Sequence, residues 1–360
     1  MYPTYIKGEL EMEKIYLQPV IEEIRTAVKN HEIEGRPGEY RRWRWQNEQG
    51  TRSMDKNEYG CADAMNLLYT INDFYCDDET RKARIAALQS MQDKETGLFS
   101  ESTHHPYHTT AHCSAALELF EAKPLYPITA FHKYLDSKDE LYDLLDNVTR
   151  WQDAPWRDSH LGAGVYAALV NSDEITPEFS ENYFAWFKEN ADPVSGFWKK
   201  GYADKALKNP KSGGTKEPAC LYEVMAGGFH YLFNHEHAHM PLEYPERVID
   251  SCLDMFRDYG VCSIMNNSVG FIQIDWIFCL TRASRQTSYK WGQVREALLD
   301  FADIYVDYLN SLDYEKDEGF NDLHMLFGTM CALAELQSAF PGRFLTDKPL
   351  KLVLDRRPFI

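Results

Sequence analysis

Hydrophobic residues along the chain follow two alternating patterns. One kind of segment is apolar on nearly every side and rich in small residues. It begins six times, near Gly60, Thr109, Asp158, Pro218, Gly270 and Phe320. These starts lie roughly 50 residues apart, with one longer spacing, which is a period typical of helical-repeat proteins. Because a helix that is apolar all round must be covered all round, the six segments predict an inner set of helices.

The segments between them carry apolar residues on one face only. Two examples are the sets Val20, Ile21, Ile24, Val28 and Val294, Leu298, Phe301, Tyr305. Such stripes are typical of helices with one side in water, so they predict an outer set. Residues 269–275 (VGFIQID) could form a short strand, but no longer stretch alternates with the period of a strand. We therefore expect an all-α protein in which six helical hairpins close into a toroid, as a single domain over residues 1–360.

The turns that lead into the inner helices share their chemistry. Residues 92–99 read QDKETGLF and residues 192–198 read DPVSGFW. A glycine after an Asp turn permits positive φ, and the aromatic residue that follows can pack inward and anchor the turn. The recurrence of this turn supports a repeat.

The alternating hairpins, together with the Q-x4-G-x-F turn and the following HTTAHCSAALELF at residues 108–120, resemble the (α/α)6 toroids of the six-hairpin glycosidases and of the terpenoid cyclase and prenyltransferase group. As architecture the resemblance covers nearly the whole chain, whereas at the level of residues it covers only positions 92–120. It implies an active site at the mouth of a central cavity and does not identify a reaction.

Composition narrows the classes of partner. Hydrophobic residues make up 44% and charged residues 26% of the 360, which excludes a disordered chain, and the net charge of -18 disfavours nucleic acid and anionic lipid. The first residues lack a basic region followed by an apolar run, so we expect a cytoplasmic protein without membrane contact. The sequence does not predict an oligomeric state. The eight cysteines are scattered singly and are expected to be reduced thiols.

Polar residues cluster where the inner helices begin, and in a toroid these ends would surround the cavity mouth. Asp, Asn and Ser at helix starts often act as caps. Capping does not explain Asp63, His112, Glu223 and Asp275, which lie among apolar neighbours past the first residues of their helices. A carboxylate there is costly to bury unless it is paired or faces a wet cavity. We therefore take Asp63, Glu223 and Asp275 as catalytic carboxylates, with a structural ion pair as the alternative.

Histidines supply a second candidate chemistry. His108 and His112 are spaced i, i+4 and would share one helix face, while His160 and His324 lie near the starts of other inner helices. We assign His112 and His160 to catalysis and His108, Asp322 and His324 to substrate binding. No H-E-x-x-H or other zinc signature is present, so we expect no metal and no cofactor.

Aromatic and basic residues gather near the predicted mouth. Residues 41–48 (RRWRWQNE) precede the first inner helix, and tryptophan can stack on sugar rings while arginine binds carboxylates. The predicted substrate-binding residues of this kind are Trp43, Arg44, Trp45, Tyr107, Trp156, Trp198 and Trp276. Packing between the two helix rings is the alternative for these side chains.

These residues support three hypotheses about function. The first is a glycoside hydrolase that acts on an oligosaccharide, including uronate-bearing ones, through two convergent carboxylates. The second is a sugar epimerase or isomerase that uses cavity histidines, for which His112, His160, His230 and His324 are candidates. The third is a terpenoid cyclase or prenyltransferase-like protein, or a toroid that binds a partner without catalysis. The D-x-D-D motif, which supplies the catalytic acid of the cyclases, is absent from the sequence.

Overall fold

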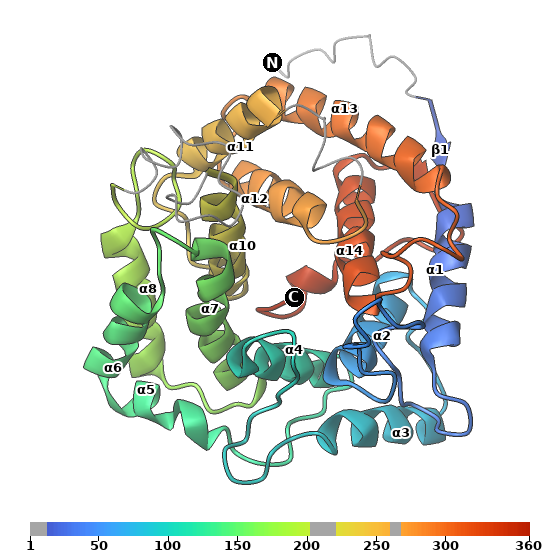
Figure 1. Ribbon diagram of the computed structural model, residues 1–360. Coiled ribbons are helices and arrows are strands. Elements are labelled where there is room, and N and C mark those ends of the chain that lie inside the picture. Colours follow the sequence, from blue (N-terminus) through green and yellow to red (C-terminus); the bar gives the residue numbers. More distant parts are fainter. Residues whose placement is uncertain (1–12, 202–220, 260–267) are drawn as a thin grey trace, which may run out of the picture.

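The computed structural model describes residues 13–201, 221–259 and 268–360, and its regular structure is almost entirely helical. Six helices form an inner set in which each contacts the next and the last contacts the first (Figure 1). They are α2 (Glu58–Thr70), α4 (Pro106–Glu118), α7 (Pro155–Asn171), α10 (Leu221–His237), α12 (Ile272–Gln286) and α14 (Leu323–Ala339). The prediction of an all-α protein is confirmed.

Further helices lie outside this circuit (Figure 1). They are α1 (Gln18–His31), α3 (Asp78–Gln89), α5 (His132–Asp136), α6 (Lys138–Asp143), α8 (Pro177–Asn190), α11 (Pro245–Tyr259) and α13 (Trp291–Asn310). Between α4 and α7 the outer layer is broken into α5, α6 and one π-helical turn, η2 (Leu144–Val148), instead of one long helix. The described strands are two-residue pieces, β1 (Ile15–Tyr16) and β2 (Phe344–Leu345), which pair in parallel.

Burial follows the two predicted patterns. Val20, Ile21, Ile24 and Val28 are the buried stripe of α1, as expected for a helix that keeps one side in water. Helix α14 is buried along nearly its whole length. Each fully buried Leu or Phe contributes about 1.5–3 kcal/mol through the hydrophobic effect, so the inner helices carry most of the core. The alternative of a strand at residues 269–275 is wrong, since α12 begins at Ile272.

The turn before α4 shows why its residues recur. Gly97 has φ of 74°, and a Cβ there would lie 2.1 Å from the carbonyl oxygen of Pro127, so only glycine fits. The side chain of Gln92 donates to the carbonyl oxygens of Gly97 and Tyr126 and accepts from the Tyr126 amide. Phe99 is fully buried. The turn is therefore a fixed link between an outer helix and the next inner helix.

The end of the described chain runs into the centre of the helix circuit (Figure 1). The short helix η3 (Val353–Asp355) contacts both α2 and α10, and the side chains of Phe359 and Ile360 are buried. The segment fills the space between the inner helices on one side. What remains of the interior is a cavity, described below.

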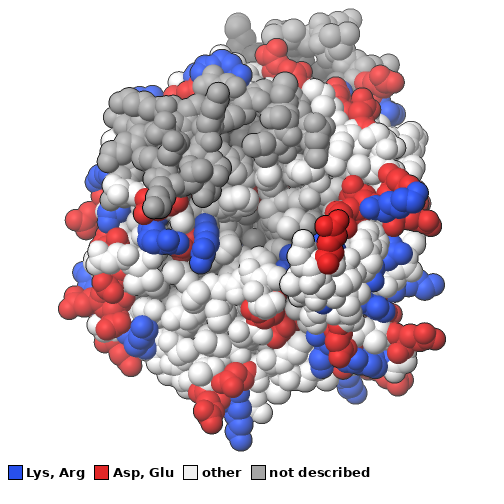
Figure 2. All heavy atoms as spheres, in the orientation of Figure 1, with Lys and Arg blue, Asp and Glu red and all other residues white. Residues whose placement is uncertain are grey.

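Charge and sulfur are distributed as the composition suggests. Figure 2 shows Lys, Arg, Asp and Glu around the margin of one face, with mostly uncharged atoms nearer its centre. No described helix combines the length and apolar character needed to cross a membrane.

Among the described cysteines, five are buried free thiols and Cys76 is an exposed one. Cys220 and Cys262 lie outside the described residues.

Candidate functional site

A cavity of about 350 Å³ lies among the inner helices, and its wall is dominated by imidazoles. The lining residues are His104, His108, Trp156, His160, His230, Ser268, Val269, Gly270, Phe271, Ile272, Asp275, His324, Met325 and Ile360. They come from α4, α7, α10, α12, α14, the segments that lead into these helices, and, for Ile360, the end of the described chain. Asp275 is the one carboxylate among the described lining residues.

Two of the cavity histidines are oriented by buried carboxylates. The Nδ1 of His104 lies 3.2 Å from Oε1 of Glu101 and 2.7 Å from the Thr103 hydroxyl. The Nδ1 of His324 lies 3.1 Å from Oδ2 of Asp63. A ring that donates from Nδ1 to a carboxylate keeps its lone pair at Nε2, so both histidines can act as bases. Their ring centroids are 5.1 Å apart.

The pKa values of these groups follow from burial and pairing. Burial lowers the pKa of His104 below its usual value, and it lowers the pKa of His324 to about 4. Burial alone would raise the pKa of Glu101, but its bonds to His104 and Thr103 bring that pKa down to about 2. Each pair therefore consists of a neutral imidazole beside an ionised carboxylate.

Asp63 is the centre of a closed cluster. It is fully buried in α2, and its Oδ1 accepts a 2.8 Å bond from Nε2 of His112 while its Oδ2 accepts from His324. The Nδ1 of His112 lies 2.6 Å from the carbonyl oxygen of Ile360. Since both partners of His112 are acceptors, both bonds form together only when both ring nitrogens carry a proton. Burial by itself would raise the pKa of Asp63. The two histidines lower that pKa by more, so the net result lies below the usual value.

Asp275 has the opposite electrostatics. It is 1% exposed in the first turn of α12, and burial raises the pKa of its carboxyl well above the usual value. The Tyr222 hydroxyl, 3.4 Å from Oδ2, opposes this shift only in part. Burial therefore favours the protonated carboxyl, which can donate a hydrogen bond into the cavity.

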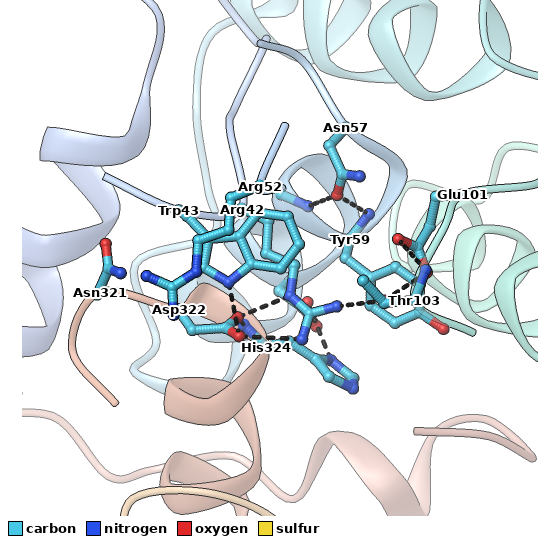
Figure 3. Close-up of polar contacts among 12 residues, drawn as sticks. Arg42, Trp43, Arg52, Asn57, Tyr59, Glu101, Thr103, Asn321, Asp322 and His324 are labelled. Carbon is cyan, nitrogen blue, oxygen red and sulfur yellow. Dashed lines mark hydrogen bonds and ion pairs between the residues drawn. The ribbon is translucent and has the colours of Figure 1, made fainter. Parts of the chain in front are cut away.

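An arginine network holds the segment before α2 against two other parts of the site (Figure 3). The guanidinium of Arg42 donates to both carboxylate oxygens of Asp322, at 2.8 and 2.9 Å, and to the Thr103 hydroxyl. The Trp43 indole also donates to Asp322, whose Oδ1 caps α14 by accepting from the His324 amide. The network thereby fixes the loop that carries His104 and the helix start that carries His324.

Three further histidines form a second cluster. One ring nitrogen from each of His108, His160 and His230 lies within 4.8 Å of the other two. The ring centroids of His108 and His160 are 4.1 Å apart, and those of His160 and His230 are 4.4 Å apart. Burial, followed by the charge of neighbouring imidazoles, lowers the pKa of His108 and His160 well below the usual value and that of His230 to about 3. These rings are neutral bases with no carboxylate among them.

The structure brings some of the predicted catalytic residues together and separates others. His160 and Asp275 line the cavity, while Asp63 and His112 lie behind His324 as its buried support. Glu223, in the first turn of α10, is not among the described lining residues. Two of the three candidate carboxylates were expected to converge, and of these three only Asp275 is among the described lining residues.

The predicted substrate-binding residues divide in the same way. His108, His324 and Trp156 line the cavity, whereas Asp322 serves as the helix cap and ion-pair partner described above. Trp43 is buried against Asp322, and Trp45 bonds to Glu318 with Arg44 over its ring. These side chains organise the segment before α2.

Three other aromatic residues pack away from the cavity, and here the sequence-based expectation needs correction. Trp276 is fully buried between Phe256 and Phe301, and its indole donates to the carbonyl oxygen of Cys252. Trp198 packs against Phe187, Tyr231 and His235. Tyr107 contacts Phe131 and Tyr134. The packing alternative holds for all three, because their rings contact these neighbouring side chains and are not among the described lining residues of the cavity.

Sequence reasoning missed His104, Glu101 and Arg42. His104 and Glu101 belong to the turn before α4, and the sequence HHPYH offered no reason to prefer one ring over another. Arg42 was one of three arginines, and the prediction favoured Arg44. The only available signal was the position of all three residues next to inner-helix starts. His235, in α10, is also buried, but it does not line the cavity.

Comparison with known proteins adds no relative: no family model matches the chain, nor does any curated protein or solved structure.

Proposed function

We propose that the chain is an (α/α)6 toroid and that its cavity is the active site of an enzyme that moves protons on a small sugar, as in an epimerase or isomerase. The observation that carries this proposal is that two carboxylate-oriented histidines, His104 and His324, line the same cavity as Asp275, whose pKa is raised by burial. The closed circuit of six inner helices with an outer layer supports the toroid assignment.

Each group has a role that fits its surroundings. His104 and His324 present Nε2 lone pairs that can remove a proton from the carbon next to a carbonyl and return one. Asp275 can donate a hydrogen bond to that carbonyl oxygen as negative charge develops there. Trp156 offers an aromatic face for the apolar side of a sugar ring.

The size of the cavity favours a small substrate. Its volume of about 350 Å³ is near the lower end of the range of roughly 300–1,000 Å³ that is usual for ligand pockets. A monosaccharide fits this space better than an oligosaccharide. The described residues that line the cavity include no Lys or Arg side chain to pair with a phosphate, which favours an uncharged sugar.

A glycoside hydrolase is less well supported by this geometry. Glycosidases need an acid and a second carboxylate on opposite sides of the scissile bond. Here Asp275 could supply the acid, but both oxygens of Asp63 are already occupied by histidines. Hydrolysis would need a carboxylate such as Glu223 to reach the cavity.

The test is to incubate the protein with a panel of monosaccharides and oligosaccharides in heavy water. Proton transfer next to a carbonyl predicts deuterium in the recovered sugar by NMR, without new reducing ends. His324→Gln and Asp275→Asn should each slow the exchange about 10²–10⁴-fold, the usual contribution of a positioned acid or base. Glu223→Gln is the matched carboxyl control and should leave the exchange unchanged.

The opposite result would favour hydrolysis. New reducing ends that disappear in Glu223→Gln, with no deuterium at carbon, would contradict the epimerase proposal. Exchange that survives both His324→Gln and Asp275→Asn would contradict the assigned roles.

A further inference from the structure

The cluster of His108, His160 and His230 brings three inner helices to one point. The three residues come from α4, α7 and α10, which are consecutive in the circuit, and all three line the cavity. One nitrogen from each ring lies within 4.8 Å of the other two. No carboxylate of the described residues belongs to this group, so its arrangement is not explained by an ion pair.

Hydrogen bonds determine which nitrogen of His230 carries the lone pair. The Ser159 hydroxyl donates its single proton to the carbonyl oxygen of Trp156, at 2.6 Å. Its oxygen must then accept from Nδ1–H of His230, which lies 2.9 Å away. The Nε2 of His230 is therefore the unprotonated nitrogen, as a metal-binding imidazole requires.

His108 has an equivalent support, and His160 does not. The Nδ1 of His108 is hydrogen-bonded to the Tyr59 hydroxyl, which leaves Nε2 for another partner. His160 makes no hydrogen bond within the described parts of the chain, and its ring is placed by contacts with the rings of His104, His108 and His230. Three imidazoles that bring one nitrogen each to the same point, with no carboxylate among them, are arranged to share a cation.

We propose that His108, His160 and His230 bind a divalent transition-metal ion of the zinc class, with its remaining coordination position open to the cavity. Imidazole nitrogens suit zinc and its neighbours in the first transition row, and hard cations such as magnesium prefer oxygen ligands. Three protein ligands with one open position are typical of catalytic rather than structural zinc sites. The ion would place a Lewis acid in the cavity wall.

The second group that could hold a metal, Asp63 with His112 and His324, is a poorer site. Both oxygens of Asp63 and both nitrogens of His112 already take part in hydrogen bonds. A metal there would have to break these bonds in a fully buried position. The imidazole cluster loses nothing comparable when it binds an ion.

The test needs no substrate, so its failure is distinct from failure of the proposed reaction. The full chain is stripped with a chelator and titrated with Co²⁺, and the visible bands of tetrahedral cobalt are followed. Zn²⁺ is then added to displace the cobalt, and equilibrium dialysis measures the stoichiometry. We expect one ion per chain.

Variants identify the ligands. His160→Ala and His230→Ala should each abolish the cobalt bands, and Ser159→Ala should weaken binding about 10–100-fold, because it removes the partner that orients His230. His105→Asn is the matched control, since it removes a nearby exposed imidazole from the start of α4 while retaining an N-cap side chain. It should bind as the unmodified chain does, and circular dichroism checks the fold of each variant.

Three outcomes would overturn the proposal. One is the absence of stoichiometric binding to the unmodified chain. Another is binding that persists in both His160→Ala and His230→Ala while these variants remain folded. The third is binding that is lost in Asp63→Asn but retained in His160→Ala, which would assign the ion to the other cluster.

Discussion

Two neighbouring clusters of three residues lie inside the ring of inner helices, and only one of them contains a carboxylate. The Asp63 cluster (Asp63, His112, His324) contains a carboxylate, and its polar atoms take one another as partners. The imidazole cluster (His108, His160, His230) contains none, and its rings meet through their unpaired nitrogens. His108 and His112 are one helical turn apart on α4, with ring centroids 6.2 Å apart, yet they belong to different clusters.

The difference shows how one residue type serves two purposes. In the Asp63 cluster the carboxylate accepts hydrogen bonds from both histidines, so its burial is offset by charge-assisted bonds. In the imidazole cluster, burial and the neighbouring rings lower the pKa values of His108 and His160, which favours the neutral form of both rings. A cluster whose polar atoms all have hydrogen-bond partners stabilises the fold. A cluster whose polar atoms lack such partners is held in place by the surrounding structure and is available to a ligand.

The largest effect should come from removing the anion. Asp63→Ala leaves the fully buried, doubly hydrogen-bonded His112 without its carboxylate and the largely buried His324 without its acceptor. Loss of one partner from a buried charged pair costs about 3–5 kcal/mol, and we expect this decrease in the free energy of unfolding by urea. Asp63→Asn, which preserves shape, is the control and should cost less. A loss below about 1 kcal/mol would show that the cluster is not structural.

An intermediate effect should appear as pH falls, in metal-free protein. His235 belongs to neither cluster and shows the effect of burial without neighbouring histidines. Burial lowers the pKa of His235 to about 4. Its unfolded value is about 6.5, so the unfolded chain binds the proton first, and stability is lost as pH falls from about 6.5 to 4. The slope should be about 1.4 kcal/mol per pH unit for each such histidine.

His235→Phe tests this contribution because it keeps an aromatic ring against Trp198 and removes the titrating group. Urea unfolding between pH 7 and 4 should show a shallower slope than in the unmodified chain. An unchanged slope would mean that His235 titrates with a normal pKa when the protein is folded.

The smallest effect should come from His160→Ala in metal-free protein. His160 is partly exposed to the cavity and makes no hydrogen bond to the described residues, so its removal orphans no polar partner and relieves crowding between imidazoles. We expect the free energy of unfolding to change by less than about 1 kcal/mol, as is usual away from buried networks. A loss as large as that for Asp63→Ala would remove the contrast between the two clusters.

The helices could be read from the sequence because their signals are local. Five of the predicted inner-helix starts fall within a few residues of the observed ones; for example, Gly60 lies in α2, which begins at Glu58. The sixth, near Pro218, lies outside the described residues. The turn at Gly97 was predictable because a positive φ and an inward aromatic leave a fixed sequence signature. The broken outer layer at α5 and α6 was not predicted.

The candidate site was predicted only in part. That polar residues at inner-helix starts surround a cavity is supported by His108, His160 and Asp275, which line it. The grouping of these residues was not predicted, and neither was the packing of Trp198 and Trp276 in the core. The grouping and the packing of Trp276 depend on how a helix is rotated about its axis relative to its neighbours, and the packing of Trp198 depends on the path of the segment after α8.

The sequence by itself determined that this chain is helical, that the helices alternate between fully and partly apolar, and that the i, i+4 histidines of α4 share a face. Periodicity and turn chemistry act within one or two helical turns, so they are visible along the chain. Only the tertiary structure decided that His112 meets a carboxylate and His108 meets two more imidazoles. Those partners lie on other helices, and a small rotation of any of them would exchange a satisfied cluster for an open one.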